Sequence, residues 1–347
     1  TQIIQKQAYK LLHPSNAFRI LEQEALAERI TDLTGMPEVF FCNSGSEANE
    51  TAIKLTRLFG HKKGIDRPSI IVMTGAFHGR SLATLTATGE RKHQAGFEPL
   101  VPGFVRAPFN DIGVIRTIAS NRQDVVAVML EPIQGEGGLT VADEAYLHAI
   151  VDLCKANDWL FIFDEVQTGN GRTGDLFAYM GLGIQPDILT TAKGLGNGIP
   201  IGACLMGDRV RGLFTPGSHG STSGGNPLAC ATAHTVLDVI VRDHLCERAA
   251  TLGLQLKQAL MTSIGDHPGV RGIRGKGLML GVELDRPAHH LCRIGLEEGI
   301  LLNVTAGTVV RLLPPLIMCD EELDELVARF VRTFERFMAL SVGTTIC

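Results

Sequence analysis

Long apolar runs, paired cysteines and an excess of positive charge are all missing from this 347-residue sequence. Its longest apolar stretches, such as 125–130 and 159–163, are far shorter than the roughly 18 residues that a membrane-spanning helix needs. The 32 basic and 37 acidic residues give a net charge of −5, which argues against a broadly basic nucleic-acid-binding protein. No Cys-x-x-Cys pair occurs among the eight cysteines, so we expect reduced thiols in a cytoplasmic protein rather than a disulfide framework.

Aromatic residues are also scarce, at 5%, whereas glycine is abundant at 39 residues. Few aromatics disfavour a surface on which bases stack, and many glycines suit an enzyme with tight loops. A typical domain size of about 150 residues predicts two domains for a chain of this length. His289, His290 and Cys292 are neighbours on one predicted helix, where they cannot converge on one ion, so no metal site is predicted.

Short apolar runs alternate with amphipathic segments as far as residue 247, the pattern of a mostly parallel sheet with helices on both faces. From residue 248, two strand-like runs between helices indicate a smaller α+β domain. We expect a large domain at 15–247, a small one at 248–347 and, because the chain begins inside a helical pattern, the remnant of an N-terminal segment at 1–14. Strands are predicted at 39–42, 69–73, 125–130, 159–163, 187–190, 201–206, 278–284 and 309–313, and helices at 47–59 and 143–156.

Ligands of open α/β sheets bind at the carboxyl ends of the strands, so the residues at these ends are candidates for a site. The first strand is followed by Ser44, Gly45 and Ser46 and then by a helix, whose N-terminus can bind a phosphate. The alternative is an ordinary serine cap with no ligand. The sequence matches neither a Walker loop nor G-x-G-x-x-G, so no nucleotide is implied.

Two charged residues follow two further strands. Asp164 comes directly after five apolar residues and therefore needs a cationic or hydrogen-bonding partner, although it could simply cap the next turn. Lys193 stands between an apolar strand and a glycine-rich loop, where a desolvated lysine could form a Schiff base. Taken alone, it could equally be a surface lysine. A phosphate site, an acid and a lysine at successive strand ends together are what pyridoxal 5'-phosphate (PLP) requires.

The sequence resembles the class III (ornithine-type) PLP-dependent aminotransferases of fold type I, and within them the branch that acts on acetylornithine. The resemblance implies a large α/β domain with a mostly parallel sheet and a smaller α+β C-terminal domain. It rests on motifs that follow one another in the order of the family: FFCNSGSEANETAIKLTR, GAFHGRSLATLTATG, EPIQGEGG, FDEVQTGNGRTG, PDILTTAKGLGNGIPIGA, HGSTSGGNPLACATA and RLLPPL.

The resemblance also implies a role for each matching residue. The catalytic pair is Lys193, which would hold the cofactor, and Asp164, which would face its ring nitrogen. The other expected cofactor contacts are Gly45 and Ser46 at the phosphate, Phe77 and Val166 on the two ring faces, Gln167 at the ring hydroxyl, and Thr222 from the neighbouring subunit of a homodimer. The expected substrate contacts are Arg80, Glu136, Ser221 and Arg311, with Glu136 pairing with Arg311 when no second carboxylate is bound.

The implied reaction moves the ω-amino group of N-acetylornithine to 2-oxoglutarate, as in arginine biosynthesis. Succinylornithine, ornithine and 4-aminobutyrate remain alternative donors. A catalytically silent PLP-binding protein is the rival from another class, and the presence of Lys193, Asp164 and both arginines counts against it. The sequence departs from the family at Ser223, where an aromatic residue is usual, and at Asn197, where glycine is usual.

Overall fold

The computed structural model describes residues 1–340, and its chain folds into two compact units. The larger unit comprises Thr1–Pro132, Ala142–Asn170 and Phe177–Asp243. The smaller unit contains the chain from His244 onward together with two short segments from the middle of the sequence, 133–141 and 171–176. The ranges predicted from the sequence, 1–14, 15–247 and 248–347, do not include these two interruptions.

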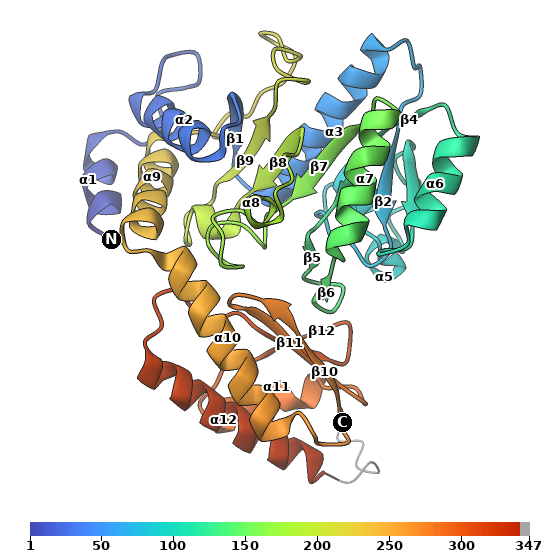
Figure 1. Ribbon diagram of the computed structural model, residues 1–347. Coiled ribbons are helices and arrows are strands. Elements are labelled where there is room, and N and C mark those ends of the chain that lie inside the picture. Colours follow the sequence, from blue (N-terminus) through green and yellow to red (C-terminus); the bar gives the residue numbers. More distant parts are fainter. Residues whose placement is uncertain (341–347) are drawn as a thin grey trace. The chain divides into compact units, whose positions relative to one another are not determined.

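The larger unit is built on a seven-stranded sheet in the order β1-β9-β8-β7-β4-β2-β3 (Figure 1). Strand β9 is antiparallel to both of its neighbours, and the other pairs are parallel, which confirms the predicted mostly parallel sheet. The strands are β1 (Glu38–Cys42), β2 (Ser69–Met73), β3 (Phe104–Ala107), β4 (Val125–Leu130), β7 (Leu160–Asp164), β8 (Ile188–Thr191) and β9 (Gly202–Met206).

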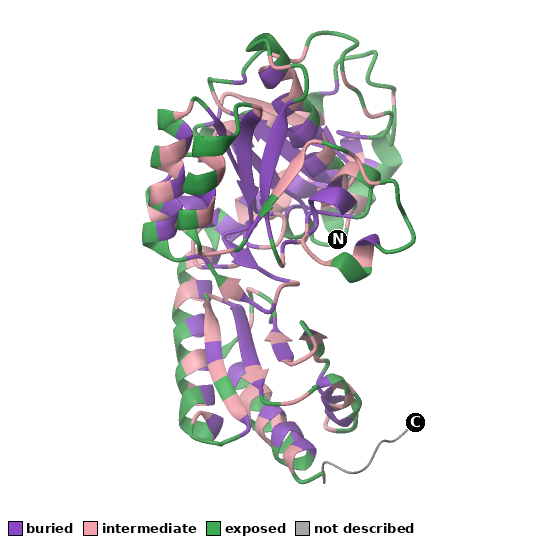
Figure 2. Ribbon diagram, turned by 90° about the vertical axis from the view of Figure 1, so that its right-hand side faces the viewer, coloured by how far each residue is buried: buried purple, intermediate pink, exposed green. Residues whose placement is uncertain are grey.

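Every residue of β2, β4, β7 and β8 is buried, and because successive side chains point to opposite faces, both faces of the sheet are covered. Figure 2 shows these strands as buried, whereas the helices carry buried and exposed residues side by side. Helix α3 packs on the strands through Ala48, Ala52 and Leu55. The helices are α1 (Gln2–Lys10), α2 (Leu21–Thr34), α3 (Gly45–Lys62), α4 (Leu82–Ala87), α5 (Arg91–Gln94), α6 (Ile112–Asn121), α7 (Glu144–Ala156), α8 (Ala178–Leu182) and α9 (Pro227–Arg242).

The smaller unit has an antiparallel sheet in the order β10-β11-β13-β12 and three helices that share one apolar core with it. Its short hairpin, β5 (Ile133–Gln134) with β6 (Thr140–Val141), comes from the first of the two interrupting segments. The other elements are β10 (Val270–Lys276), β11 (Met279–Leu284), β12 (Asn303–Thr305), β13 (Val309–Leu312), α10 (Leu245–Ile264), α11 (His289–Glu297) and α12 (Asp320–Met338).

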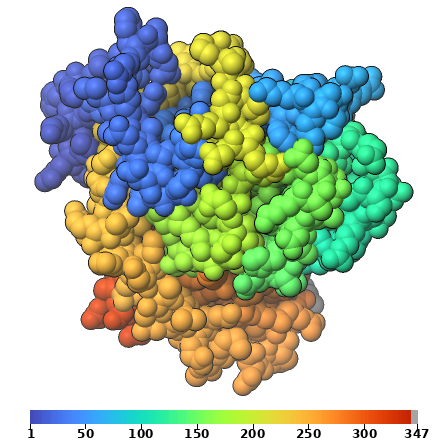
Figure 3. Space-filling model, turned by 45° about the horizontal axis from the view of Figure 1, so that its top comes forward, coloured from blue at the N-terminus to red at the C-terminus, as the bar shows by residue number. Residues whose placement is uncertain are grey.

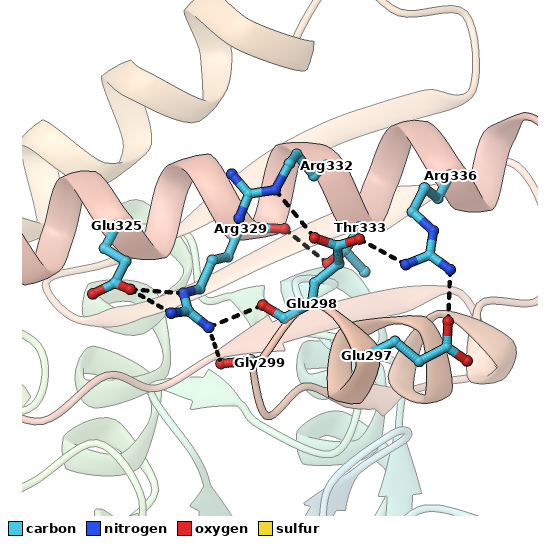
Figure 4. Close-up of polar contacts among 8 residues, drawn as sticks. All are labelled: Glu297, Glu298, Gly299, Glu325, Arg329, Arg332, Thr333 and Arg336. Atoms are coloured by element: carbon cyan, nitrogen blue, oxygen red, sulfur yellow. Dashed lines mark hydrogen bonds and ion pairs between the residues drawn. The ribbon is translucent and has the colours of Figure 1, made fainter.

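Charged side chains join α12 to the end of α11 (Figure 4). The Glu298 carboxylate accepts hydrogen bonds from Arg336 at 2.6 Å and Arg332 at 3.1 Å, and these arginines lower the pKa of that carboxyl. Arg329 donates to the carbonyl oxygens of Glu298 and Gly299, the two residues that follow α11. The two helices are thereby held at a fixed register. Across residues 1–340, no helix has the length and apolar character needed to cross a membrane.

Candidate active site

The carboxyl ends of β1, β7 and β8 lie at the same edge of the larger sheet because these three strands point the same way. A cavity of about 540 Å³ opens there, within the larger unit. The structure brings together at its wall eight of the residues predicted from the sequence: Gly45, Ser46, Phe77, Arg80, Asp164, Val166, Gln167 and Lys193.

The N-terminus of α3 forms one wall of this cavity. Ser44 caps the helix by accepting a hydrogen bond from the backbone N–H of Glu47 at 3.2 Å, which is compatible with a cap alone and with a cap beside a bound phosphate. Gly45 and Ser46 follow it and present the first turn of the helix to the cavity. A Cβ atom at Gly45 would lie 2.6 Å from a methyl group of Val166, so no larger residue fits there. The free N–H groups and the positive end of the helix dipole suit an anion at this wall.

Phe77 and Arg80 enter the cavity from the loop before α4. The Arg80 guanidinium carbon lies 5.9 Å from the centre of the Phe77 ring, within the range of a cation–π contact. Gly79 between them has a φ of +137°, and a Cβ atom at this position would lie 2.5 Å from the Ser46 hydroxyl oxygen. A glycine is therefore required here, and it lets the loop approach the N-terminus of α3 closely.

Asp164 is the last residue of β7 rather than the first residue after it, and it is 3% exposed. Its Oδ2 accepts hydrogen bonds from Asn49 at 2.7 Å and from His78 Nδ1 at 2.8 Å, and its Oδ1 accepts one from the backbone N–H of Val166 at 3.0 Å. Three donors compensate the carboxylate for the loss of water and fix its direction. The carboxylate is thus held ready for a cationic partner in the cavity.

Sequence reasoning missed three buried polar residues around Asp164, namely Asn49, His78 and Glu131. Glu131 follows the six apolar residues of β4, so the strand-end rule that selected Asp164 could have found it too. Its Oε1 accepts a hydrogen bond from the backbone N–H of Phe77 at 2.9 Å, which ties the aromatic residue to the end of β4. Burial raises the pKa of Glu131, and the negative charge of Asp164 raises it further, against the effect of His78.

Lys193 begins a short 3₁₀ turn after β8, and its φ of +42° lies in the left-handed region. The structure leaves the residue exposed, so the desolvation expected from the sequence is not found. The backbone just before it is fixed by the buried Asn170 side chain, which donates to the Thr191 hydroxyl at 2.9 Å and to the Ala192 carbonyl at 3.3 Å. The backbone before Lys193 is therefore held by Asn170, a buried residue of the loop that follows β7.

Two of the predicted residues lie elsewhere in the larger unit. Among residues 1–340, Ser221 and Thr222 line a separate hollow of about 520 Å³ and not the Lys193 cavity. Asn16 reaches this segment and donates to the carbonyls of Ser221 at 2.7 Å and Gly224 at 2.9 Å. Figure 3 shows the segment before α9, in yellow, beside the blue N-terminal residues. Ser223 is exposed, and nothing in the structure explains why a serine stands there.

His219 anchors the same segment to α3. One ring nitrogen of His219 lies 2.9 Å from the Thr51 hydroxyl, and the other lies 2.8 Å from Lys54 Nζ. Because a lysine ammonium can only donate, the nitrogen facing Lys54 carries no proton and His219 is neutral. Burial and the Lys54 charge lower the pKa of His219, in agreement with this geometry.

The two remaining predicted residues, Glu136 and Arg311, lie in the smaller unit and form an ion pair. Arg311 Nη1 donates to Glu136 Oε1 at 2.7 Å, and their side chains are 11% and 38% exposed respectively. Glu136 lies in the loop of the β5–β6 hairpin, and Arg311 lies on β13. The partnership that the resemblance implies is thus present in the structure.

Residues 1–340 contain no group of three His, Cys, Asp or Glu side chains that could hold a metal ion. The seven cysteines from Cys42 to Cys319 are free thiols, and Cys347 lies outside the described residues.

Comparisons with known proteins agree on one family. The model of aminotransferase class-III matches residues 1–334. Acetylornithine aminotransferase 1 of Bordetella bronchiseptica is 48% identical over 97% of this chain and 86% of its own length. Acetylornithine aminotransferase of Methanothermobacter thermautotrophicus is 45% identical over 92% of this chain and 80% of its own.

Solved structures give the same result. The ornithine aminotransferase of Toxoplasma gondii, crystallised with partial occupancy of PLP at its active site, superposes with a TM-score of 0.92 at 34% identity, over 96% of this chain and 81% of that one. The N-acetylornithine aminotransferase of Stenotrophomonas maltophilia superposes with a TM-score of 0.84, also at 34% identity, over 97% and 86% of the two chains. The chain is therefore a member of the class-III aminotransferases.

Proposed function

We propose that this chain is a PLP-dependent aminotransferase that moves the ω-amino group of N-acetylornithine to 2-oxoglutarate, giving N-acetylglutamate semialdehyde and glutamate. The observation that carries the proposal is the cavity that gathers Lys193 and Asp164 with the N-terminus of α3. Relatives named acetylornithine aminotransferase at 45–49% identity support the choice of donor. The reaction would place the protein in arginine biosynthesis.

The residues of the cavity fit PLP by their chemistry. The first turn of α3, with Gly45 and Ser46, suits a phosphate, and Phe77 and Val166 offer apolar surface for the two faces of a ring. The buried Asp164 carboxylate suits a protonated pyridine nitrogen, and Lys193 carries the primary amine that can hold the aldehyde. Gln167 lines the same cavity and is proposed to contact the ring hydroxyl.

When bound, PLP supplies an electron-withdrawing ring that makes the carbon next to the substrate nitrogen acidic. Asp164, which is buried and accepts hydrogen bonds from Asn49 and His78, would face the ring nitrogen and favour its protonated form. Lys193 would act as the base that takes the proton from the substrate carbon bonded to nitrogen and delivers it to the carbon on the other side of that nitrogen. The buried support of Asn170 keeps the lysine at the cavity wall during this transfer.

Arg80 and Arg311 are proposed to bind the carboxylates of the substrates, as a guanidinium does with two parallel hydrogen bonds. Glu136 neutralises Arg311 while a donor without a second carboxylate is bound. When 2-oxoglutarate arrives, its second carboxylate takes the place of Glu136. The enzyme would thereby accept a neutral-tailed amine and a dicarboxylate in turn, with ping-pong kinetics.

A second copy of the chain completes this proposal. Thr222 would reach the phosphate, and Ser221 the substrate, in the partner's cavity, which accounts for their absence from the Lys193 cavity of their own chain. The protein would then be a homodimer with shared active sites, and we place it in the cytoplasm.

The donor is tested by half-reactions with the cofactor-loaded enzyme. Acetylornithine, succinylornithine, ornithine and 4-aminobutyrate are each mixed with the enzyme in the absence of 2-oxoglutarate, and the change of the cofactor's visible absorption is followed. We expect the largest rate per molar concentration with acetylornithine. A preference for unacylated ornithine would contradict the proposed substrate. No absorption change with any amine would support a catalytically silent protein.

The role of Lys193 predicts the behaviour of a Lys193→Ala variant. The variant should lose turnover by at least about a thousandfold, because both the bond to the cofactor and the base are removed. Its bound cofactor should also lack the visible absorption of the wild type. Lys62→Ala, at an exposed lysine of α3, is the matched control and should keep both. Substantial turnover by a correctly folded Lys193→Ala protein would show that another residue is the base.

A further inference from the structure

The segment that carries Glu136 is attached to the sheet of the smaller unit, although it lies between two strands of the larger unit in the sequence. Residues 133–141 group with the C-terminal part of the chain. Ile133 and Leu139 form one buried cluster with Met279 of β11 and Val309 of β13. The hairpin is therefore held by an apolar contact on each side of Glu136, three residues away in both directions.

Two side chains of the small sheet also donate hydrogen bonds to the backbone of this hairpin. The Thr305 hydroxyl donates to the carbonyl oxygen of Glu136 itself. Arg274 donates to the carbonyl oxygen of Gly138 through two nitrogens, Nε at 3.0 Å and Nη2 at 2.6 Å. Arg274 is in turn fixed by an ion pair between its Nη1 and Glu283 of β11. The loop that carries Glu136 is thus hydrogen-bonded to the small sheet at Glu136 and at Gly138.

The register of the sheet explains why these contacts act together on Glu136. Strands β12 and β13 pair Asn303 with Arg311 and Thr305 with Val309. Residues that face each other across strands share a face, and so do residues two apart along a strand, so Thr305 and Arg311 project from the same face. Thr305 holds the backbone of Glu136, and Arg311 holds its carboxylate. One face of the small sheet therefore positions both ends of the residue.

We propose that Thr305 and Arg274 are positioning residues that hold the Glu136 carboxylate on Arg311 and so set how easily the second carboxylate of a dicarboxylate substrate displaces it. The inference rests on the proposed function in one respect, that Arg311 receives a substrate carboxylate. With its backbone fixed, Glu136 loses little conformational freedom on pairing and competes strongly for Arg311. Without these hydrogen bonds to the backbone, the Glu136–Arg311 pair costs more conformational entropy to form, and a dicarboxylate displaces Glu136 from Arg311 more easily.

The test uses the cofactor-loaded enzyme and glutarate, an unreactive five-carbon dicarboxylate, with binding measured by calorimetry. Thr305→Val removes the hydroxyl at nearly constant volume, and Thr305→Ser retains it. We expect glutarate to bind Thr305→Val about three- to tenfold more tightly than the wild type, the range set by losing one hydrogen bond, and Thr305→Ser to match the wild type. Pentanoate, with a single carboxylate, should bind all three proteins alike.

Arg274 provides an independent pair of variants. Arg274→Met should tighten glutarate binding in the same direction, and Arg274→Lys, which keeps a charge opposite Glu283 and one donor, should lie between it and the wild type. The KM for 2-oxoglutarate should fall in Thr305→Val, while the rate of the half-reaction with the amine donor changes little. Glu136→Gln, which removes the competing charge, sets the upper limit of the effect. Thermal unfolding of each variant reports whether the small unit is intact.

Three outcomes would overturn the inference. Equal glutarate affinities of Thr305→Val and wild type would show that the hydroxyl does not influence the competition. Parallel changes for glutarate and pentanoate would show a general structural effect. Failure of glutarate to bind any variant, Glu136→Gln included, would show that Arg311 does not receive a second carboxylate. Failure of the proposed donor is a separate result, because it is read from the acetylornithine half-reaction and leaves the glutarate comparison intact.

Discussion

At the scale of single residues, the loop after β8 holds two side chains in an unusual backbone conformation. Lys193 has a φ of +42° and Asn197 a φ of +44°. The left-handed region costs a residue with a Cβ atom roughly 1–2 kcal/mol of conformational free energy, and asparagine adopts this region more readily than most residues do. The positive φ of residue 197 therefore explains why asparagine can stand where the family usually has glycine. Lys193 tolerates the same conformation because buried neighbours fix the chain before it.

The backbone at Asn197 predicts a difference between two small substitutions. Asn197→Gly should stay within about 1 kcal/mol of the wild-type free energy of unfolding, whereas Asn197→Ala should be less stable than Asn197→Gly by about 1–2 kcal/mol. Glycine and alanine differ by one methyl group on an exposed residue, so the comparison reports the conformation rather than lost contacts. Urea unfolding measures both. An alanine variant as stable as the glycine variant would contradict the left-handed conformation.

Residue chemistry at strand ends predicted four of the eight residues that line the cavity, Gly45, Ser46, Asp164 and Lys193, because parallel strands bring their carboxyl ends to one edge. The other four, Phe77, Arg80, Val166 and Gln167, were predicted only from the resemblance to the family. Sequence reasoning missed Asn49 and His78 for a physical reason. Asn49 lies in a helix and His78 in a loop, and the residues next to them in the sequence give no sign that either side chain is buried. Only the fold shows that both contact Asp164. Their importance arises from distant contacts, 115 and 86 residues along the chain.

At the scale of elements, the predicted strands agree with the structure to within about one residue at each end wherever the strand is an uninterrupted apolar run. Within residues 1–340, five strands were not predicted: the two-residue strands β5 and β6, which are too short to show a pattern, and β3, β10 and β12. The last three lie at the edges of their sheets, and each includes exposed or half-exposed residues, such as the charged positions of β10. An edge strand has a partner on one side only, so its sequence needs fewer apolar residues and the periodic signal is weak.

Helix α8 illustrates how a buried acid can replace an ordinary cap. The residue before the helix, Phe177, provides no side-chain cap. Instead, the fully buried Glu165 accepts hydrogen bonds from the first backbone N–H groups of α8, at Ala178 (2.6 Å) and Tyr179 (2.9 Å), and from the Thr168 hydroxyl. Burial nevertheless raises the pKa of Glu165 to about 7.

This raised pKa makes the contribution of Glu165 to stability depend on pH. The folded state holds the proton up to about pH 7, whereas the unfolded chain releases it near 4.5, so the contribution is full below 4.5 and is lost as the pH rises through 7. Glu165→Gln turns an amide N–H toward a backbone donor and should cost about 1–3 kcal/mol at pH 5. The difference between the variant and the wild type should shrink toward pH 8.

Urea unfolding of both proteins at several pH values between 5 and 8 checks this expectation. Glu28→Gln, at an exposed acid of α2, is the control and should show a difference that does not change with pH over this range. A stability gap for Glu165→Gln that stays constant from pH 5 to 8 would mean that Glu165 is ionised in the folded protein throughout this range.

At the scale of the whole molecule, the sequence predicted two domains but not the two segments that cross between the units. The hairpin at 133–141 follows a strand of the larger sheet and looks like its continuation, and only its apolar partners on β11 and β13 assign it to the smaller unit. As a consequence, the Glu136–Arg311 pair lies within one unit, and its geometry does not depend on the other.

The surface of the larger unit supports the proposed homodimer. Residues 9–21 expose several large apolar side chains, among them Tyr9 at 95%, Phe18 at 69% and Leu21 at 70%. A cluster of such residues on one stretch of chain is typical of a protein–protein interface. The same stretch includes Asn16, which holds the segment with Ser221 and Thr222. The apolar surface and the residues assigned to the partner's cavity are thus structurally connected.

Shared active sites predict that two inactive variants restore activity when their subunits exchange. In a mixed dimer of Lys193→Ala and Thr222→Ala chains, one site carries both defects and the other has an intact Lys193 and an intact Thr222. An equal mixture should therefore recover roughly a quarter of wild-type activity at limiting PLP, since half of the dimers are mixed and each has one intact site. Each variant alone should be far less active, because Thr222→Ala loses a hydrogen bond to a charged phosphate.

The control is a mixture of Lys193→Ala with the double variant that carries both substitutions. It contains no intact site under any pairing and should stay inactive. If the Lys193→Ala and Thr222→Ala mixture showed no more than the summed activity of its components after exchange, Thr222 would serve the cavity of its own chain. That result would require the segment before α9 to turn toward Lys193 and leave the hollow where Asn16 holds it, so the complementation decides between one placement of Thr222 and the other.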